Sequence, residues 1–353
     1  MIETSASVDR LEPVEDVGGK AQPLLLVSGL TKHFPVRGDL FSARKTVRAV
    51  DDVSFTIAKG ETLGIVGESG CGKSTTARLL MHLMARDAGD IVYDGRQVGR
   101  ALSLRELRRA MQMVFQDSYA SLNPRLTIEQ SIAFGPKVHG MLDAAARARE
   151  LLGKVGLRPE TFANRYPHEI SGGQRQRVNI ARALALSPRL VILDEAVSAL
   201  DKSVEAQVLN LLVDLKREFG LTYLFISHDL NVVRYISDRV LVMYLGEVVE
   251  LGPVDRVWAA PAHPYTRALL AAMPSSDPDN RTEVPPISGD PPNPIDPPPG
   301  CRFHTRCPFA EPLCANATPK LNVLDTMGHQ AACYMAIPGS GHSLAPAKGA
   351  DVA

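Results

Sequence analysis

One eight-residue segment constrains the fold of this chain more than any other. Residues 67–74 read Gly-Glu-Ser-Gly-Cys-Gly-Lys-Ser, which matches the pattern G-x-x-x-x-G-K-[ST]. The segment directly follows an apolar run at residues 62–66 and opens a helical pattern, so it is expected to join a buried strand to a helix. Glycines let such a loop wrap a phosphate with backbone N–H groups, and the helix start adds a favourable field. The motif predicts a phosphate-binding loop in an α/β domain.

Two side chains of this loop have predicted roles. Lys73 is expected to reach the β- and γ-phosphates of a nucleotide, and the Ser74 hydroxyl is expected to coordinate Mg²⁺. An ordinary glycine-rich turn is the alternative, which the strand before it and the helix after it disfavour. The other residues expected around the phosphates are Gly67, Glu68, Ser69, Gly70, Cys71, Gly72 and Thr75.

Short apolar runs predict the strands of the sheet. Residues 62–67, 111–116, 189–195 and 222–228 are β-rich and apolar throughout, as in parallel strands that are covered on both faces. Helical patterns lie between these runs, which favours an α/β fold.

Two further segments predict smaller subdomains. Residues 49–60 alternate apolar and polar side chains, and Asp94-Gly95 is a hairpin signal, so a small antiparallel β subdomain is expected. Residues 127–166 are typical of a mostly helical insert.

Composition and charge restrict the function. Lysine plus arginine equals aspartate plus glutamate at 39 each, whereas a protein that coats nucleic acid usually carries a basic excess. No secretory signal opens the chain, and no apolar run approaches the roughly 20 residues of a membrane-spanning helix. We therefore expect a cytosolic protein with reduced thiols, held at any membrane by partners.

The predicted domains follow the changes of composition. Residues 285–299 contain eight prolines, too many for a helix or an interior strand, so they are expected to form an extended connector. The full division is a flexible tail at 1–20, a nucleotide-binding domain at 21–260, a linker at 261–300, a four-cysteine module at 301–336 and a flexible tail at 337–353.

Two more segments belong with the phosphate loop. Asp194 and Glu195 end an apolar run, which places both carboxylates at the carboxyl edge of the sheet, where α/β proteins bind ligands. Asp194 is expected to hold Mg²⁺, and Glu195 to orient or polarise the attacking water. Ser171-Gly172-Gly173-Gln174 precedes a helical pattern and is expected to present backbone N–H groups to an anion.

This order of motifs resembles the ATP-binding cassette (ABC) ATPases over residues 24–252. The resemblance implies a P-loop ATPase core that binds ATP with Mg²⁺. It gives Gln116 the role of the Q-loop glutamine, which contacts Mg²⁺, and gives Asp201 a place in the D-loop. His228 matches the switch histidine at the γ-phosphate, and Phe34 the aromatic residue that stacks on adenine. Two departures from the family pattern are Ile170 for leucine and Ala196 for proline.

In this family the signature segment of one cassette completes the ATP site of another. One phosphate loop and one signature in this chain therefore imply a dimer that closes on ATP and opens after hydrolysis.

The second chemical feature is a group of cysteines near the C-terminus: Cys301, Cys307, Cys314 and Cys333. In a cytosolic protein such a group more often binds metal than forms disulfides. Zinc sites tend to use close C-x-x-C pairs, which are absent here, so an iron–sulfur cluster is favoured over zinc or unliganded thiols. His304 and His329 are rival ligands.

The C-terminal third narrows the resemblance. His263-Pro264-Tyr265-Thr266, the proline-rich stretch and CRFHTRCP resemble the extension of importer ATPases for oligopeptides, dipeptides and nickel. Some members of that group carry a four-iron cluster at these cysteines. The resemblance implies a heterodimer with a paralogous ATPase subunit, two transmembrane permease subunits and an extracytoplasmic peptide-binding protein, at the cytoplasmic face of the membrane.

Two other functions compete with peptide import. ATPases of this kind that act on nucleic acid or ribosomes usually carry two cassettes or a large insertion, and the His-Pro-Tyr segment argues against an exporter.

Overall fold

The computed structural model describes residues 16, 18–19, 21–36, 45–273 and 289–347. The chain divides into two compact units, which we describe separately. Unit 1 comprises residues 1–24, 58–60 and 93–224, and unit 2 comprises residues 25–57, 61–92 and 225–353. The predicted N-terminal tail lies mostly outside the described residues, as does part of the proline-rich connector.

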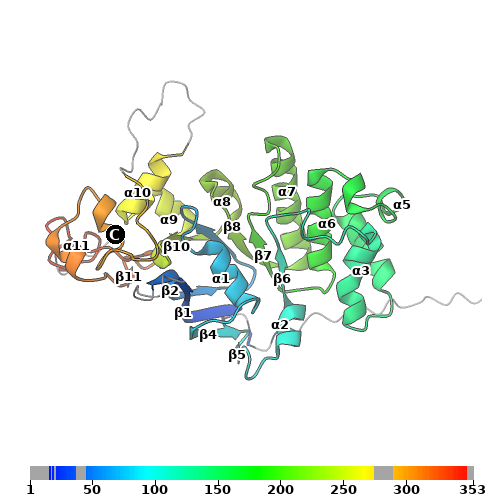
Figure 1. The fold of residues 1–353 in the computed structure, drawn as a ribbon, viewed down its shortest axis with the longest axis horizontal. Helices are drawn as coiled ribbons and strands as arrows, with labels where there is room; N and C mark the ends of the chain where they lie inside the picture. The colour runs from blue at the N-terminus through cyan, green and yellow to red at the C-terminus, as the bar shows by residue number, and fades with distance from the viewer. Residues whose placement is uncertain (1–15, 17, 20, 37–44, 274–288, 348–353) are drawn as a thin grey trace, which may run out of the picture. The chain divides into compact units, whose positions relative to one another are not determined.

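Unit 2 combines an antiparallel pair with a mixed set of strands (Figure 1). β1 (Leu25–Val36) pairs antiparallel with β2 (Lys45–Ile57), which confirms the antiparallel pattern predicted for residues 49–60. β3 (Thr62–Val66) runs parallel to β9 (Arg239–Tyr244), and β9 pairs antiparallel with β10 (Glu247–Pro253). The remaining elements are α1 (Lys73–Leu80), β4 (Ala88–Tyr93, whose last residue is in unit 1), α8 (Leu230–Ile236), α9 (Val254–Ala259) and α10 (Pro264–Ala271).

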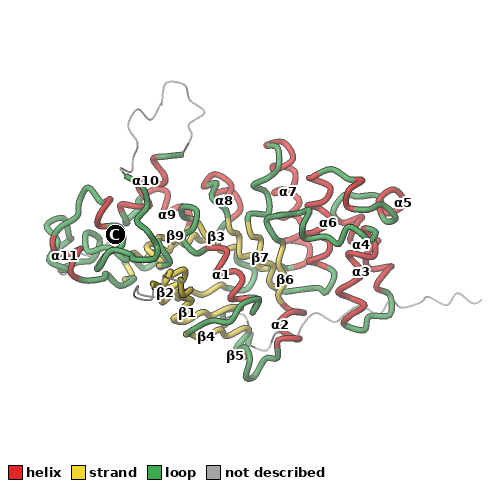
Figure 2. Tube along the Cα trace, viewed as in Figure 1, coloured by secondary structure: helices red, strands yellow, loops and turns green. Residues whose placement is uncertain are grey.

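The C-terminal extension is mostly loop, as Figure 2 shows for the part that follows residue 289. It holds a 3₁₀ turn η2 (His304–Arg306), α11 (Pro312–Asn316), β11 (Asn322–Val323) and β12 (Gln330–Ala331). β12 pairs with β10, so the extension adds two short strands to the sheet of unit 2.

Residues 337–347 differ from the flexible tail that the composition predicts. Ser340 Oγ donates to the Tyr334 carbonyl over 2.6 Å, and His342 Nε2 lies 2.9 Å from the Phe309 carbonyl oxygen. The His342 side chain is buried, so this segment packs on the cysteine module.

Unit 1 contains the predicted helical insert. α3 (Ile128–Val138), α4 (Ala144–Lys154) and α6 (Gly172–Leu184) pack against one another, and Figure 2 shows them with the one-turn helix α5 (Pro159–Phe162). α3 and α6 both begin at a capping box, formed by Thr127 with Gln130 and by Ser171 with Gln174. The other elements are β5 (Arg96–Gln97), α2 (Leu104–Ala110), η1 (Pro167–Glu169) and α7 (Lys202–Phe219).

The apolar runs of unit 1 form strands as predicted. β6 (Met111–Val114) runs parallel to β7 (Leu190–Asp194), and β8 (Thr222–Ile226, whose last two residues are in unit 2) is the next neighbour of β7. Every residue of β3, β7 and β8 is buried, which is why these strands are continuously apolar. Asp94 and Gly95 have φ angles of 46° and 76°, the left-handed values of a tight hairpin turn.

A buried carboxylate ties separate segments of unit 1 together. The Asp94 side chain is 1% exposed and lies 3.0 Å from Lys59 Nζ and 2.7 Å from an Arg189 guanidinium nitrogen. Lys59 and Arg189 come from segments far apart in the sequence, so this ion pair fixes residues 58–60 within the unit.

Candidate functional site

The phosphate loop connects β3 to α1 in unit 2. A Cβ on Gly67 would lie 2.2 Å from the Met243 carbonyl oxygen, and a Cβ on Gly72 would lie 2.2 Å from that of Ala49. The φ angles of 150° and 109° at these glycines are also in the region that side chains avoid. Because the loop presses against the backbone of β9 and β2, glycine is required at both positions.

Lys73 is buried inside the loop at the start of α1. Its Nζ donates to the carbonyl oxygens of Gly67 (2.8 Å) and Glu68 (3.0 Å). Ser74 and Thr75 follow in the first turn of the helix. The ammonium group of Lys73 is thus turned inward onto the carbonyl oxygens of the loop.

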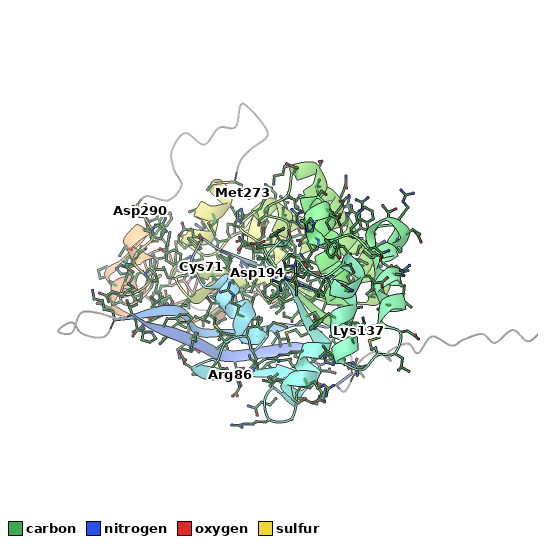
Figure 3. The ribbon with its side chains drawn as sticks, turned by 45° about the vertical axis from the view of Figure 1, so that its right-hand side comes forward. Cys71, Arg86, Lys137, Asp194, Met273 and Asp290 are labelled. Atoms are coloured by element: carbon green, nitrogen blue, oxygen red, sulfur yellow. The ribbon has the colours of Figure 1, made fainter. Side chains whose placement is uncertain are left out.

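Cys71 also lies in this loop, as Figure 3 shows beside α1. Burial raises the pKa of its thiol, so the sulfur is protonated and uncharged at neutral pH.

Two other predicted residues belong to unit 2. His228 is exposed and follows the end of β8, where the Ser227 N–H donates to the Ile65 carbonyl of β3 over 3.3 Å. His228 is therefore the next residue after one that is hydrogen-bonded to β3, the strand before the phosphate loop. Phe34 lies on β1, 37% exposed, opposite Val47 of β2.

Unit 1 brings two of the predicted residues together. Gln116 follows β6, and its Nε2 donates to Glu195 Oε2 over 2.9 Å. Asp194, labelled in Figure 3, is the last residue of β7 and is buried. Glu195 has a φ of 48°, a left-handed value that is costly for a residue with a side chain and is typical of functional sites.

The signature segment and the D-loop residue occupy helix starts in unit 1. Ser171 is the N-cap of α6, and its Oγ accepts the Gln174 N–H over 3.3 Å. Gly172 and Gly173 form the first turn of this helix, whose leading backbone N–H groups have no partner within the helix. Asp201 is the N-cap residue of α7.

The predicted residues are thus divided between the units. Unit 2 holds the phosphate loop, Phe34 and His228, and unit 1 holds the other predicted residues around ATP.

The C-terminal cysteines line one small pocket. Cys301, Cys307, Cys314 and Cys333 surround it together with His263, Phe303, His304 and His342. Burial raises the pKa of Cys301 to about 12 and that of Cys333 to about 11, and the neighbouring thiols act in the same direction. His329, the other rival ligand, instead pairs with Glu250 over 2.7 Å.

No single-ion metal site accompanies this pocket. Among the residues that the structure describes, no three His, Cys, Asp or Glu side chains are close enough to hold one metal ion. Of the predicted metal site, the structure therefore shows that the four thiols line one pocket, and it shows no arrangement of ligands around a metal ion among the described residues.

His263 is held neutral beside the cysteines. Its ring is fully buried, and its Nδ1 accepts the Tyr265 N–H over 3.0 Å, so the proton is on Nε2. Among the residues that the structure describes, Nε2 has no hydrogen-bond partner. Burial lowers the pKa of His263 to about 4.

This depressed pKa predicts a pH dependence of stability. Between pH 6.5 and 4 the folded chain binds fewer protons at His263 than the unfolded chain, so stability falls as the pH falls. The contribution is at most about 3 kcal/mol. Urea denaturation of the wild type and of His263→Phe at several pH values measures it. We expect the unfolding free energy of the variant to depend less on pH between 6.5 and 4. An equal pH dependence in both proteins would contradict the lowered pKa of His263.

Sequence reasoning missed three residues that join the extension to the rest of unit 2. Glu250 on β10 is fully buried and accepts the N–H groups of Ala262 (2.7 Å) and His263 (2.9 Å). Tyr265 and Arg306 both bond to Glu68 of the phosphate loop. No local pattern signals these contacts, because the partners are between 12 and 238 positions apart in the sequence.

The comparisons with known proteins match these features. Residues 50–198 match the family model described as ABC transporter, and residues 249–314 match that of the oligopeptide/dipeptide transporter C-terminal region. A probable peptide ABC transporter ATP-binding protein of Sinorhizobium fredii is 52% identical over 337 residues, which cover 94% of this chain and 95% of the relative. The chain belongs to the ABC transporter ATPases.

Two further similarities agree with the assignment. The oligopeptide transport ATP-binding protein AppF of Bacillus subtilis is 49% identical over 89% of this chain and 98% of the relative. The structure of cbiO1 of Clostridium perfringens, part of the ABC transporter complex cbiONQ, matches with a TM-score of 0.57 and 28% identity, over 67% of this chain and 91% of that one. The predicted α/β P-loop ATPase fold is confirmed.

Membership of the family also confirms the predicted activity. The chain is an ATP-binding subunit of an ABC transporter, and it hydrolyses ATP with Mg²⁺. No helix in the described parts of the chain is long and apolar enough to span a membrane.

Proposed function

We propose that this ABC ATPase powers the import of oligopeptides or dipeptides. The observation that carries the proposal is the joining, in one chain, of an ABC region with an oligopeptide/dipeptide C-terminal region at residues 249–314. The Sinorhizobium and Bacillus relatives, named for peptide and oligopeptide transport, align over nearly their whole lengths.

Co-purification from native membranes tests this function. The tagged full-length chain is isolated in detergent, its partners are identified by mass spectrometry, and the complex is reconstituted with its binding protein. We expect permease subunits, a second ATPase subunit and ATP-dependent uptake of labelled peptides. Recovery of ribosomes, or uptake of nickel without uptake of peptides, would contradict the proposal.

The predicted site residues have proposed roles in ATP hydrolysis. Lys73 binds the β- and γ-phosphates, and Ser74 and Asp194 hold Mg²⁺. Glu195 orients and polarises the attacking water, and His228 contacts the γ-phosphate. In support, the phosphate loop follows β3, Asp194 ends β7 with Glu195 directly after it, and His228 follows β8. Ligands of α/β proteins bind beyond the carboxyl ends of such strands.

We also propose that ATP is bound between this chain and a paralogous ATPase subunit. The chain carries one phosphate loop and one signature segment, and in the ATPases that it resembles the signature of one cassette completes the ATP site of another. The first turn of α6 suits that position, because the N-terminus of a 13-residue helix favours a phosphate anion. Asp201, at the start of α7, is proposed to lie where the two ATPase subunits meet.

Permease subunits are proposed to dock on the helical part of unit 1. Tyr119, Phe134, Val138 and Leu142 are large apolar side chains exposed between β6 and α4, and Leu142 is 89% exposed. All four come from one stretch of 24 residues, and protein docking sites are built from exposed apolar side chains that gather on one surface. This docking would hold the chain at the cytoplasmic face of the membrane, with the peptide-binding protein on the opposite face.

For the cysteine pocket we propose a [4Fe-4S] cluster. Four thiols line one pocket, which is the ligand set of an iron–sulfur cluster, and none of them belongs to the close C-x-x-C pairs that zinc sites tend to use. His263 lines the same pocket, and its buried Nε2–H finds no partner within the described parts of the chain, which would leave it free to donate to a cluster sulfur. When bound, the cluster would cross-link the four thiolates.

Anaerobic purification tests the cluster. We expect iron, labile sulfide and visible absorption in the wild type, and their loss in Cys307→Ser, which removes one of the four thiols. Cys71→Ser is the matched control, because this buried thiol belongs to the phosphate loop. Stoichiometric zinc without visible absorption would reject the cluster.

A further inference from the structure

The cysteine module makes a direct contact with the phosphate loop. Arg306 donates from both guanidinium NH₂ groups to the Glu68 carboxylate, over 3.0 Å to Oε2 and 3.2 Å to Oε1. Such a two-point arginine–carboxylate pair fixes orientation as well as distance. The two residues are 238 positions apart in the sequence, yet both belong to unit 2.

Three groups of Glu68, its carboxylate, its backbone N–H and its backbone carbonyl, each make a hydrogen bond. Its carboxylate accepts from Arg306, its backbone N–H donates to the Tyr265 hydroxyl over 2.8 Å, and its carbonyl accepts from Lys73 over 3.0 Å. Two of these partners belong to the C-terminal extension, and the third is the lysine that is proposed to bind phosphate. The C-terminal extension therefore holds Glu68, whose carbonyl oxygen is also a hydrogen-bond partner of Lys73.

The position of Arg306 is itself determined by the cysteine module. It ends the turn η2, in which the His304 N–H donates to the Cys301 carbonyl over 3.0 Å, and it directly precedes Cys307. Its guanidinium group also lies over the Tyr244 ring, 5.9 Å from the centroid, and donates to the Tyr244 hydroxyl over 3.3 Å.

Because the Arg306–Glu68 ion pair is largely buried, losing one partner is expected to cost stability. The Arg306 side chain is only 7% exposed, and the Glu68 side chain is 25% exposed. Removing either partner leaves the other charge poorly compensated, and truncation of buried pairs is strongly destabilising for that reason. Since Glu68 is the only carboxylate paired with Arg306 among the described residues, its side chain is the route by which Arg306 acts on the loop.

We propose that Arg306 is a positioning residue for nucleotide binding, acting through Glu68 to hold the phosphate loop in its binding shape. This inference rests on the proposed ATP site. A loop that is ordered before the ligand arrives loses less conformational freedom on binding, so its affinity for the phosphates is higher. The cysteine module thereby contributes to ATP affinity without contacting ATP.

The test measures binding of the fluorescent analogue mant-ATP, with Mg²⁺, to the full-length chain. We expect Arg306→Gln to bind about tenfold more weakly than the wild type, which corresponds to about 1.4 kcal/mol. Glu68→Gln should show a similar loss, and it serves as the second variant if Arg306→Gln does not fold. Because both act through one pair, the double variant should lose no more than either single variant.

Arg256→Gln is the matched control. Arg256 on α9 also joins the extension, through Asp325 over 3.2 Å, but that ion pair does not involve the phosphate loop. A general effect of loosening the extension would weaken mant-ATP binding in this variant as well, and we expect no change. In the assembled transporter, Arg306→Gln should raise KM for ATP and leave kcat nearly unchanged.

The outcomes separate this inference from the proposed function. Equal affinity of the wild type and of both single variants would overturn the role of Arg306 alone. Additive losses in the double variant would overturn the route through Glu68. A wild-type chain that fails to bind mant-ATP, or a Lys73→Ala variant that binds it as tightly as the wild type, would overturn the proposed ATP site itself.

Discussion

Replacing Glu195 by glutamine is expected to preserve ATP binding and to lower the hydrolysis rate by about 10²–10⁴-fold, the usual contribution of a general base. The amide has nearly the same shape, and its oxygen can still accept the hydrogen bond that Gln116 donates to Glu195 over 2.9 Å. It has no negative charge with which to polarise water. The loss should therefore appear in kcat and not in the affinity for ATP.

ATP turnover of the assembled transporter and mant-ATP binding by the full-length chain measure the two effects. Glu205→Gln is a control carboxylate of the same unit, because Glu205 pairs with Lys202 on α7 and is outside the proposed site. We expect it to hydrolyse ATP at the wild-type rate. Wild-type turnover by Glu195→Gln would remove Glu195 from the chemistry.

The backbone conformation at Glu195 separates its side chain from that of Asp194 and brings it to Gln116. Its φ of 48° turns the chain sharply after Asp194, the last residue of β7, and its carbonyl accepts the Ser198 hydroxyl over 3.0 Å. Neighbouring carboxylates in the sequence thus receive different surroundings, one buried and one partly exposed. Such a division suits one carboxylate for metal and the other for water.

The sequence predicted the parts of the fold that depend on short-range patterns. The phosphate loop was predictable because Gly67 and Gly72 occupy positions where any side chain would collide with the backbone. Strands such as β3 and β7 were predictable because burial on both faces requires an unbroken apolar run. The capping box at Ser171 and Gln174 likewise marks the start of α6 locally.

Contacts across long sequence separations were not predictable. Arg306 lies in a cysteine-rich segment, and nothing near it indicates that its charge is matched by Glu68. His342 lies in a stretch of small residues whose composition predicted a flexible tail, yet its ring is buried against Phe309. In each case one specific pairing outweighs the composition of the surrounding segment.

Replacing Glu250 by alanine is expected to destabilise the chain by about 3–5 kcal/mol, the usual cost of removing one partner of a buried ion pair or network. The Glu250 carboxylate is fully buried, accepts the N–H groups of Ala262 and His263, and lies 2.7 Å from His329 Nε2. Alanine leaves these groups without an acceptor in a place that water does not reach. The loss should loosen the start of α10 and β12 together.

Chemical denaturation of the full-length chain measures the change, and hydrogen exchange at the amides of Ala262 and His263 locates it. Glu250→Gln should lose less stability, because it keeps one acceptor oxygen and nearly the same volume. Glu218→Ala is the control for an exposed pair, since Glu218 contacts Lys154 at the surface, where such pairs contribute about 0–1 kcal/mol. If Glu250→Ala were as stable as Glu218→Ala, the Glu250 carboxylate would not be what holds the start of α10 and His329 to β10.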